Sequence, residues 1–188
     1  KTKAIVIVHY LGKPARVDEI SKICKKRNIY LIEDCALSLG AKIGNKFVGR
    51  FGDFACFSFY PAKHITTGDG GMLICKDKNF YKKVKLLKGF GVDKNFNERK
   101  IPGEYDVKLL GLNYRLDEIR SQIGITQLKK IDKFINVRRK NYYFLKNSLR
   151  SVKNFKFLDL ETHGKYQSSF YCASIILSKK ISRYRFQI

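Results

Sequence analysis

Two short apolar runs separated by a helical pattern constrain the fold of this 188-residue chain more than any other feature. Residues 4–9 (AIVIVH) and residues 29–33 (IYLIE) are rich in apolar, β-branched side chains and predict buried strands. Between them, residues 17–28 carry apolar side chains at helical spacing and end in basic residues, as helix C-termini prefer. Strand, helix and strand in this order indicate a βαβ unit with a parallel sheet, so we predict an α/β fold.

Further apolar runs extend this alternation of strands and helices. Residues 54–59 (FACFSF) and 72–75 (MLIC) predict two more strands, and a glycine-rich loop at residues 66–71 lies between them. Residues 79–88 predict another helix, because their apolar side chains share one helical face.

The later part of the chain has a different pattern. Residues 92–111 are polar and predict a long loop, and long ordered loops are often functional. Residues 117–149 predict two helices or one long bent helix, and short strand-like pieces follow. We therefore expect a domain boundary near residue 150, with residues 1–150 in part of a large domain and residues 151–188 at the start of a small α+β domain.

The net charge of +23 raises the local concentration of anions, including nucleic acids and phosphorylated ligands. The basic residues are spread along the chain, however, and no block of five or more like charges occurs. We interpret most of them as lysines on solvated helix faces. Nucleic-acid binding remains an alternative that rests on charge alone, because no RNP, helix-turn-helix or zinc-finger pattern is present.

The five cysteines favour a reducing compartment. Their number is odd, they form no CxxC pair, and four of them lie in or beside apolar runs, as buried free thiols do. We therefore expect a cytoplasmic protein with neither a disulfide framework nor a zinc site. No run of 18 apolar residues predicts a membrane span, and the N-terminal residues do not resemble a secretory signal.

Two carboxylates, Glu33 and Asp34, end the second predicted strand. In parallel α/β sheets the ligand crevice lies outside the carboxyl ends of the strands. A carboxylate at this place can face a ligand, cap the next helix or pair with a lysine, and the pattern leaves the three interpretations open.

Lys63 follows the strand at residues 54–59 and precedes the glycine-rich loop. Glycines let backbone N–H groups approach an anion, but neither the GxxxxGK[ST] pattern nor GxGxxG is present. A lysine that forms a Schiff base is another possibility, and a surface lysine is the third. Spacing alone does not choose among them.

A series of motifs in a fixed order carries more information. It comprises VHYLGKPA (residues 8–15), EDCA (33–36), GD (52–53), FSF (57–59), KHITTGDGG (63–71), LKGFG (87–91) and GLNYRL (111–116). In this order the motifs resemble those of the DegT/DnrJ/EryC1/StrS-type sugar aminotransferases, from residue 4 to about residue 150.

The resemblance implies a fold-type-I large domain that binds pyridoxal 5'-phosphate (PLP), with a mostly parallel central sheet and helices on both faces. The implied enzyme transfers an amino group from an amino acid such as glutamate to a nucleotide-linked keto-sugar, for polysaccharide, glycan or antibiotic sugars. The nucleotide and the sugar depend on variable loops, including residues 92–106. The dehydratase branch of the family has His in place of the lysine, so Lys63 favours the aminotransferase branch.

The resemblance also implies roles for four residues. Lys63 matches the Schiff-base lysine, which holds the cofactor and moves protons as a general base. Asp34 matches the aspartate that pairs with the pyridine nitrogen and makes the ring a better electron sink. Ser58 matches a contact to the cofactor phosphate. Asn113 matches the asparagine that reaches the phosphate of a neighbouring subunit, which implies a homodimer with shared active sites.

Structural interpretations of some residues stay open. Ser58 can be a strand residue bonded to backbone, and Asn113 can be a turn residue. His9 can be a packed core histidine or a ligand, and Arg115 can serve a dimer interface or a helix end. His64 receives no role.

The sequence also departs from the family. Family members often have Gln or His three residues after the aspartate, in contact with the cofactor's ring hydroxyl, and this chain has Leu37 there. Relative to the family, the chain lacks an N-terminal stretch with a phosphate-binding loop and most of the small domain, so we expect a fragment or a truncated product. A non-catalytic homologue with a binding or regulatory role is therefore the alternative to the enzyme.

Overall fold

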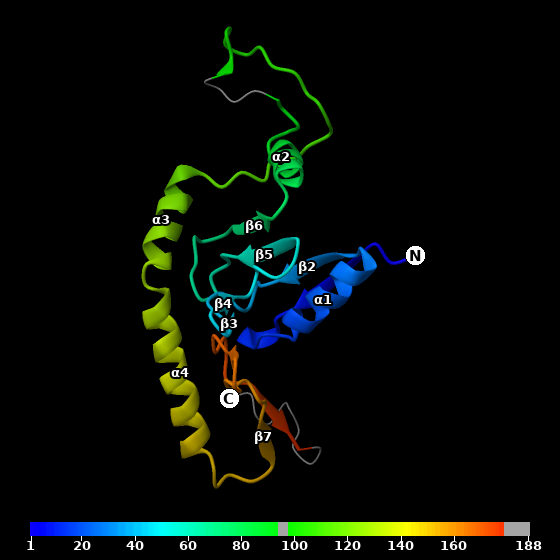
Figure 1. The fold of residues 1–188 in the computed structure, drawn as a ribbon. Coiled ribbons are helices and arrows are strands. Elements are labelled where there is room, and N and C mark those ends of the chain that lie inside the picture. The colour runs from blue at the N-terminus through cyan, green and yellow to red at the C-terminus, as the bar shows by residue number, and fades with distance from the viewer. Residues whose placement is uncertain (94–97, 179–188) are drawn as a thin grey trace.

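The computed structural model describes residues 1–93 and 98–178 and is built on a four-stranded sheet (Figure 1). The strands lie in the order β1 (Ala4–Val8), β2 (Tyr30–Asp34), β5 (Phe54–Ser58) and β6 (Gly71–Cys75). The pairs β1–β2 and β2–β5 are parallel, and β6 is an antiparallel edge strand on β5. The predicted α/β fold with a mostly parallel sheet is therefore confirmed.

Helix α1 (Val17–Arg27) covers one face of the sheet, as the βαβ pattern predicts. Its buried residues Val17 and Cys24 form a cluster with Leu31 of β2, and Ile5 and Ile7 of β1 pack against it. The helix ends where Asn28 takes a left-handed conformation, with φ of 51°, and donates its N–H to the last turn.

Helix α2 (Lys78–Leu87) lies over one corner of the opposite face. Asp77 caps it by accepting hydrogen bonds from two backbone N–H groups of its first turn. The Phe80 ring packs 5.5 Å from that of Tyr30 and 5.1 Å from that of Phe54, measured between centroids. Because side chains alternate along a strand, Tyr30 and Phe54 point away from Leu31 and α1. Helices therefore contact both faces, as expected.

The described residues of the polar stretch after α2 form a loop, as its composition predicts, and this loop projects away from the sheet (Figure 1). An isolated bridge joins Val92 to Val107, and Lys108 pairs with Asp93 and Asp106. The nucleotide and the sugar were expected to depend on variable loops that include residues 92–106. Residues 94–97 of that range lie outside the described residues.

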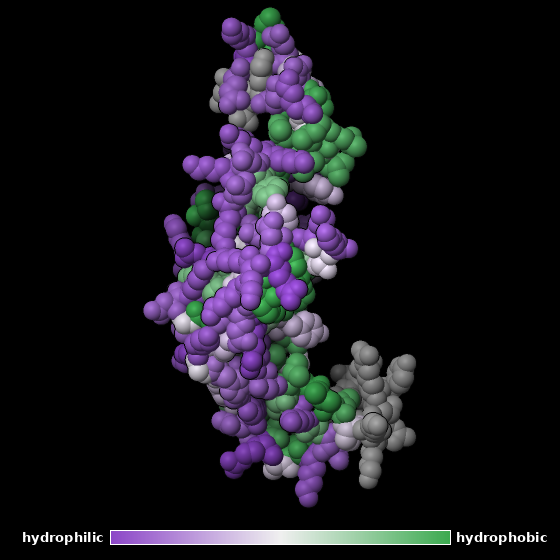
Figure 2. All heavy atoms as spheres, turned by 45° about the vertical axis from the view of Figure 1, so that its right-hand side comes forward, coloured by the Kyte–Doolittle hydropathy of each residue, from purple (hydrophilic) through white to green (hydrophobic). Residues whose placement is uncertain are grey.

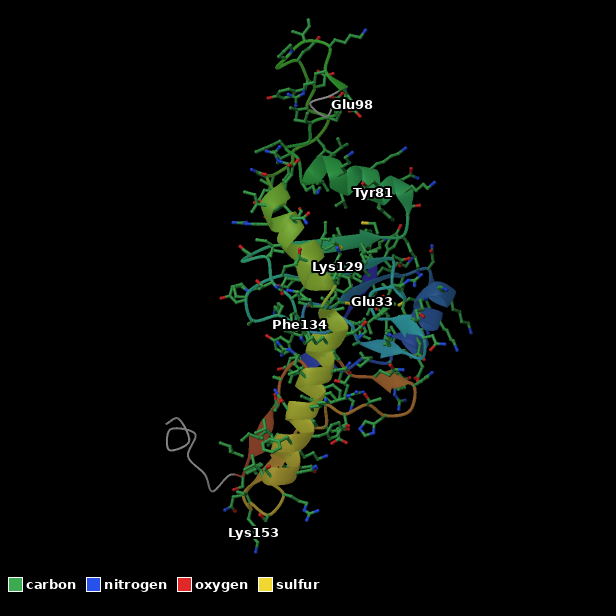
Figure 3. All side chains as sticks on the ribbon, turned by 90° about the vertical axis from the view of Figure 1, so that its left-hand side faces the viewer. Glu33, Tyr81, Glu98, Lys129, Phe134 and Lys153 are labelled. Carbon is green, nitrogen blue, oxygen red and sulfur yellow. The ribbon has the colours of Figure 1, made fainter. Side chains whose placement is uncertain are left out.

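The helical pattern at residues 117–149 corresponds to two helices, α3 (Glu118–Leu128) and α4 (Ile131–Ser148). Asp117 caps α3 with a 2.7 Å hydrogen bond from the Arg120 N–H. The two helices form one column beside the sheet, and Lys129 marks their junction (Figure 3). Ile135 of α4 packs closely on Gly40. A methyl group added at Gly40 would lie 2.2 Å from the Cδ1 atom of Ile135.

The residues after α4 form two small antiparallel sheets. Strand β7 (Phe155–Phe157) pairs with β9 (Ile175–Leu177), while β8 (Tyr166–Gln167) pairs with β3 (Lys42–Ile43), which also pairs with β4 (Lys46–Phe47). Tyr142, Leu160 and Phe170 form their buried core with α4. The domain boundary near residue 150 remains a prediction. Strand β8, which follows it in the chain, pairs with β3 in the first part of the chain.

The five cysteines are unpaired, and Cys24 and Cys35 are buried. Cys56 differs from the expectation of a buried thiol: it is exposed, on the sheet face opposite α1. In the described part of the chain no helix is both long and apolar enough to cross a membrane.

Candidate functional site

Asp34 and Ser58 lie at the edge of the sheet where the parallel strands end. Asp34 is in register with Val8 of β1 and Cys56 of β5, and Ser58 lies two residues beyond Cys56. Side chains two residues apart in a strand share a face, so Asp34 and Ser58 are on the same face of neighbouring strands. The carboxyl edge of a parallel sheet is where ligands bind in α/β folds. The structure thus brings these two predicted residues together.

The half-buried Asp34 carboxylate is held by its own turn. Its Oδ1 accepts a 3.0 Å hydrogen bond from the Ala36 N–H. Among the described residues no hydrogen bond is recorded for Oδ2, so this oxygen is able to accept a proton donor on a ligand. The Ser58 hydroxyl accepts a 3.3 Å hydrogen bond from the Tyr60 N–H.

Lys63 lies in the turn after β5 and is half-buried. Its backbone N–H donates to the Tyr60 carbonyl at 3.0 Å, which fixes the turn. Its Nζ atom lies 5.5 Å from the centroid of the Tyr171 ring, within the range of a cation–π contact. Within the described ranges Lys63 forms no ion pair. Its amine therefore lies over an aromatic ring and, among the described residues, has no carboxylate as a fixed partner.

Tyr171 is a residue that the sequence did not single out. Its carbonyl accepts a 2.7 Å hydrogen bond from Arg138 of α4, and its ring packs against that of His64. It follows Lys63 by more than a hundred residues, and no motif marks it. Only the return of the segment 168–171 to the turn after β5 brings Tyr171 to the lysine.

His64 fastens the same turn to that segment. It is 4% exposed, and its Nε2–H donates to the Ser169 carbonyl at 2.9 Å. Burial lowers its pKa to about 4; the bond to Ser169 opposes this shift, and the charges of Arg138 and Lys63 add to it. His64 is therefore a neutral structural residue.

Three backbone N–H groups of the glycine-rich loop at residues 66–71 have acceptors within or beside the loop. The N–H groups of Thr67, Gly68 and Gly70 donate to the Phe59 carbonyl, the Thr66 hydroxyl and the Asp69 carboxylate. A side chain at Gly70 would lie 2.9 Å from Leu116, so the GLNYRL segment packs on this loop. Because these N–H groups have internal acceptors, the loop serves as a tight connection between β5 and β6.

Glu33 and His9 form a buried pair, and both side chains are fully buried. The Ala15 N–H donates to His9 Nδ1 at 3.1 Å, so the ring proton lies on Nε2 and is donated to Glu33 at 3.0 Å. Glu33 also accepts hydrogen bonds of 2.6–2.7 Å from the N–H groups of Gly49, Phe51 and Gly52. Burial raises its pKa, but these donors outweigh it and lower the pKa overall. Glu33 thus takes none of the three roles left open for it and holds loop N–H groups instead, while His9 is packed in the core.

Asn113 belongs to the segment between α2 and α3 and not to the ends of the parallel strands. It is exposed, forms an isolated bridge with Gly89, and its Oδ1 accepts a 3.2 Å hydrogen bond from Arg115 Nε. No hydrogen bond in the described part of the chain joins it to Asp34, Ser58 or Lys63. An exposed position is what a contact to a second subunit requires, and that role stays a prediction. Leu37 is half-buried and offers no polar atom beyond its backbone.

The fold defines the class as an α/β protein with a mostly parallel sheet, and a lysine-bearing turn lies at the carboxyl edge of that sheet. The chain belongs to the DegT/DnrJ/EryC1/StrS aminotransferase family, whose model matches residues 1–187. This family assignment and the structural neighbours confirm the fold class that the motifs imply.

Three relatives illustrate the similarity. The chain is 39% identical to GDP-perosamine synthase of Escherichia coli O157:H7 over 152 residues, which is 81% of this chain and 40% of that protein. The structure of Helicobacter pylori PseC, an aminotransferase involved in the biosynthesis of pseudoaminic acid, superposes with a TM-score of 0.84 at 34% identity, covering 95% of this chain and 46% of that one. For E coli GDP-4-keto-6-deoxy-D-mannose-3-dehydratase with bound hydrated PLP the TM-score is 0.79 at 32% identity, with 98% and 49% covered. The chain thus spans less than half the length of each.

Proposed function

We propose that this sequence is part of a PLP-dependent aminotransferase that transfers an amino group from an amino acid such as glutamate to a nucleotide-linked keto-sugar, for glycan or polysaccharide synthesis. One observation carries the proposal: a half-buried lysine without a carboxylate partner among the described residues lies directly after β5, whose end adjoins that of β2. Family membership supports it, as does the printed activity of GDP-perosamine synthase.

The donor set fits the cofactor. The Asp34 carboxylate suits a protonated ring nitrogen, because a nearby anion favours the charged form of such a group. The Ser58 hydroxyl suits a phosphate oxygen, and the Lys63 amine suits covalent attachment and proton transfer at the substrate carbon. When bound, PLP supplies an electron sink for the carbanion that forms when that proton leaves. Leu37 supplies no hydrogen bond to the ring hydroxyl.

The proposal that the enzyme is a homodimer rests on Asn113. Its exposed side chain would reach the cofactor phosphate of the neighbouring subunit, so that each site needs residues of both subunits. A cytoplasmic location completes the proposal, since five unpaired cysteines suit a reducing compartment.

A non-catalytic homologue is the second candidate, and Leu37 favours it because one contact to the cofactor is missing. Such a protein would keep the fold and have a binding or regulatory role. In a transfer assay this homologue would move no amino group to the sugar, whereas the enzyme would.

The test follows labelled nitrogen. The protein is incubated with PLP, 15N-glutamate and a GDP-linked or UDP-linked keto-sugar, and the sugar product is analysed by mass spectrometry. We expect 15N in the sugar, and its loss in Lys63→Arg, which keeps the charge but changes the attacking group. Lys129→Arg, at the junction of α3 and α4, is the matched control and should transfer as the unaltered chain does. Equal transfer by Lys63→Arg and the unaltered chain would contradict the proposal.

A further inference from the structure

A cavity of about 250 Å³ lies at the other edge of the sheet, where β2 and β5 begin and β6 ends. Its wall includes Ser21, Lys25 and Asn28 from the end of α1 and the following turn, together with Phe51 and Lys76. Asp34 and Ser58 are at the carboxyl ends of β2 and β5. The cavity is therefore separate from the candidate cofactor site.

Cations gather around Phe51 at this cavity. Lys46 Nζ lies 4.3 Å from the centroid of the Phe51 ring, and Lys76 Nζ donates to the Phe51 carbonyl at 3.1 Å. The pKa of Lys46 is lowered by burial and by the charges of Lys76, Arg50 and Lys25, against a smaller opposing effect of Glu33. Four basic side chains are therefore close enough to repel one another.

These basic side chains outnumber the acidic ones around the cavity. In the described part of the chain no ion pair joins Lys25, Lys46, Arg50 or Lys76 to a carboxylate. Asp53 is the acidic residue in the cavity wall, and it accepts a 2.8 Å hydrogen bond from the Leu31 N–H. The face that carries α1 and the amino end of the sheet is covered mainly by hydrophilic side chains (Figure 2). An excess of positive charge beside a hollow attracts anions.

We propose that this pocket, lined by Lys25, Lys76, Ser21 and Asn28 and flanked by Lys46 and Arg50, binds a small phosphate-type oxyanion. The anion is either free phosphate or the terminal phosphate of a nucleotide. Charge-assisted hydrogen bonds from lysine and arginine to phosphate oxygens are short and strong, and the amide of Asn28 adds a neutral donor. A water molecule occupies about 30 Å³ in the liquid, so the cavity has room for a phosphate or diphosphate but is small for a whole nucleotide.

Phosphorus NMR and calorimetry of the full chain test the proposal. Inorganic phosphate, AMP and a short oligonucleotide are titrated separately, without PLP and in a phosphate-free buffer. The variant is the pair Lys46→Gln and Lys76→Gln, whose side chains are exposed, so the fold should be kept. The matched control is the pair Lys129→Gln and Lys133→Gln, which removes the same charge from exposed positions in the α3–α4 column. Circular dichroism checks that both variants fold.

We expect saturable binding of one phosphate, weakened by at least about tenfold in the pocket variant and unchanged in the control. Similar affinities for phosphate and AMP would identify the free ion as ligand, whereas binding of AMP alone would identify a nucleotide phosphate. The proposal is overturned if both variants lose affinity equally, if neither loses it, or if only the oligonucleotide binds.

Discussion

The Glu33 carboxylate fixes a loop from inside the sheet. Its four donors come from His9 and from the backbone of residues 49–52, so one side chain holds the connection between β4 and β5 in place. A buried carboxylate with this many donors stays ionised, because the hydrogen bonds replace the lost water. Glu33 in turn sets the start of β5, the strand that leads to Ser58 and Lys63.

His64 makes the stability of the chain depend on pH. Its folded pKa of about 4 is below the ordinary value of 6.5, so the unfolded chain binds a proton that the folded chain does not. The contribution of neutral His64 to the free energy of unfolding is fully present above pH 6.5, and it is lost as the pH falls towards 4. Between about pH 7.5 and pH 5 we expect a loss of about 2 kcal/mol in the free energy of unfolding. Urea denaturation at the two pH values measures it.

The control for this prediction is a histidine variant. His64→Gln should remove most of the pH dependence. An unchanged slope in His64→Gln would show that another group titrates.

At the scale of elements, the contact between the turn Tyr10–Gly12 (η1) and residues 168–171 joins the late part of the chain to the site. The Ser169 N–H donates to the Gly12 carbonyl at 2.9 Å. Gly12 has φ of +90°, and a side chain there would lie 2.8 Å from the Tyr171 backbone nitrogen. The glycine thus allows the close approach that places Tyr171 over Lys63.

Gly12→Ala should therefore lower the stability of the fold and disturb the contact between the Tyr171 ring and Lys63. We expect a loss of at least about 2 kcal/mol in the free energy of unfolding, from backbone strain and the clash with residues 169–171. Gly44→Ala is the matched control, because Gly44 also has positive φ but has nothing within 4 Å of the added methyl group. It should lose only about 1 kcal/mol in the same urea denaturation. Equal losses in the two variants would mean that the contact contributes nothing.

The sequence predicts local elements better than contacts between distant segments. Strands at residues 4–9 and 29–33 and the helix between them follow from local periodicity, and α1, β1 and β2 match them closely. The pairing of β3 with β8 joins two-residue strands far apart in the chain, so no periodicity marks it. Tyr171 was missed for the same reason, and the structural role of Glu33 depends on loop N–H groups that the pattern does not show.

For the whole molecule, the sheet face opposite α1 is exposed near the ends of β1 and β5. Val6 is 61% exposed and Val8 45% exposed, and Cys56 on β5 is exposed as well. Asp34 lies in register with Val8 and Cys56, so the candidate cofactor site borders this open apolar face. Cofactor binding by the chain is therefore the property on which the functional account depends most.

Covalent trapping of PLP tests that property most directly. The chain is mixed with an equal amount of PLP, reduced with borohydride, digested and analysed by mass spectrometry, beside the variants Lys63→Arg and Lys129→Arg. The account predicts that most of the reduced adduct lies on Lys63, that Lys63→Arg loses it and that Lys129→Arg keeps it. Adduct spread evenly over exposed lysines of a folded chain, with no change in Lys63→Arg, would contradict the role assigned to Lys63.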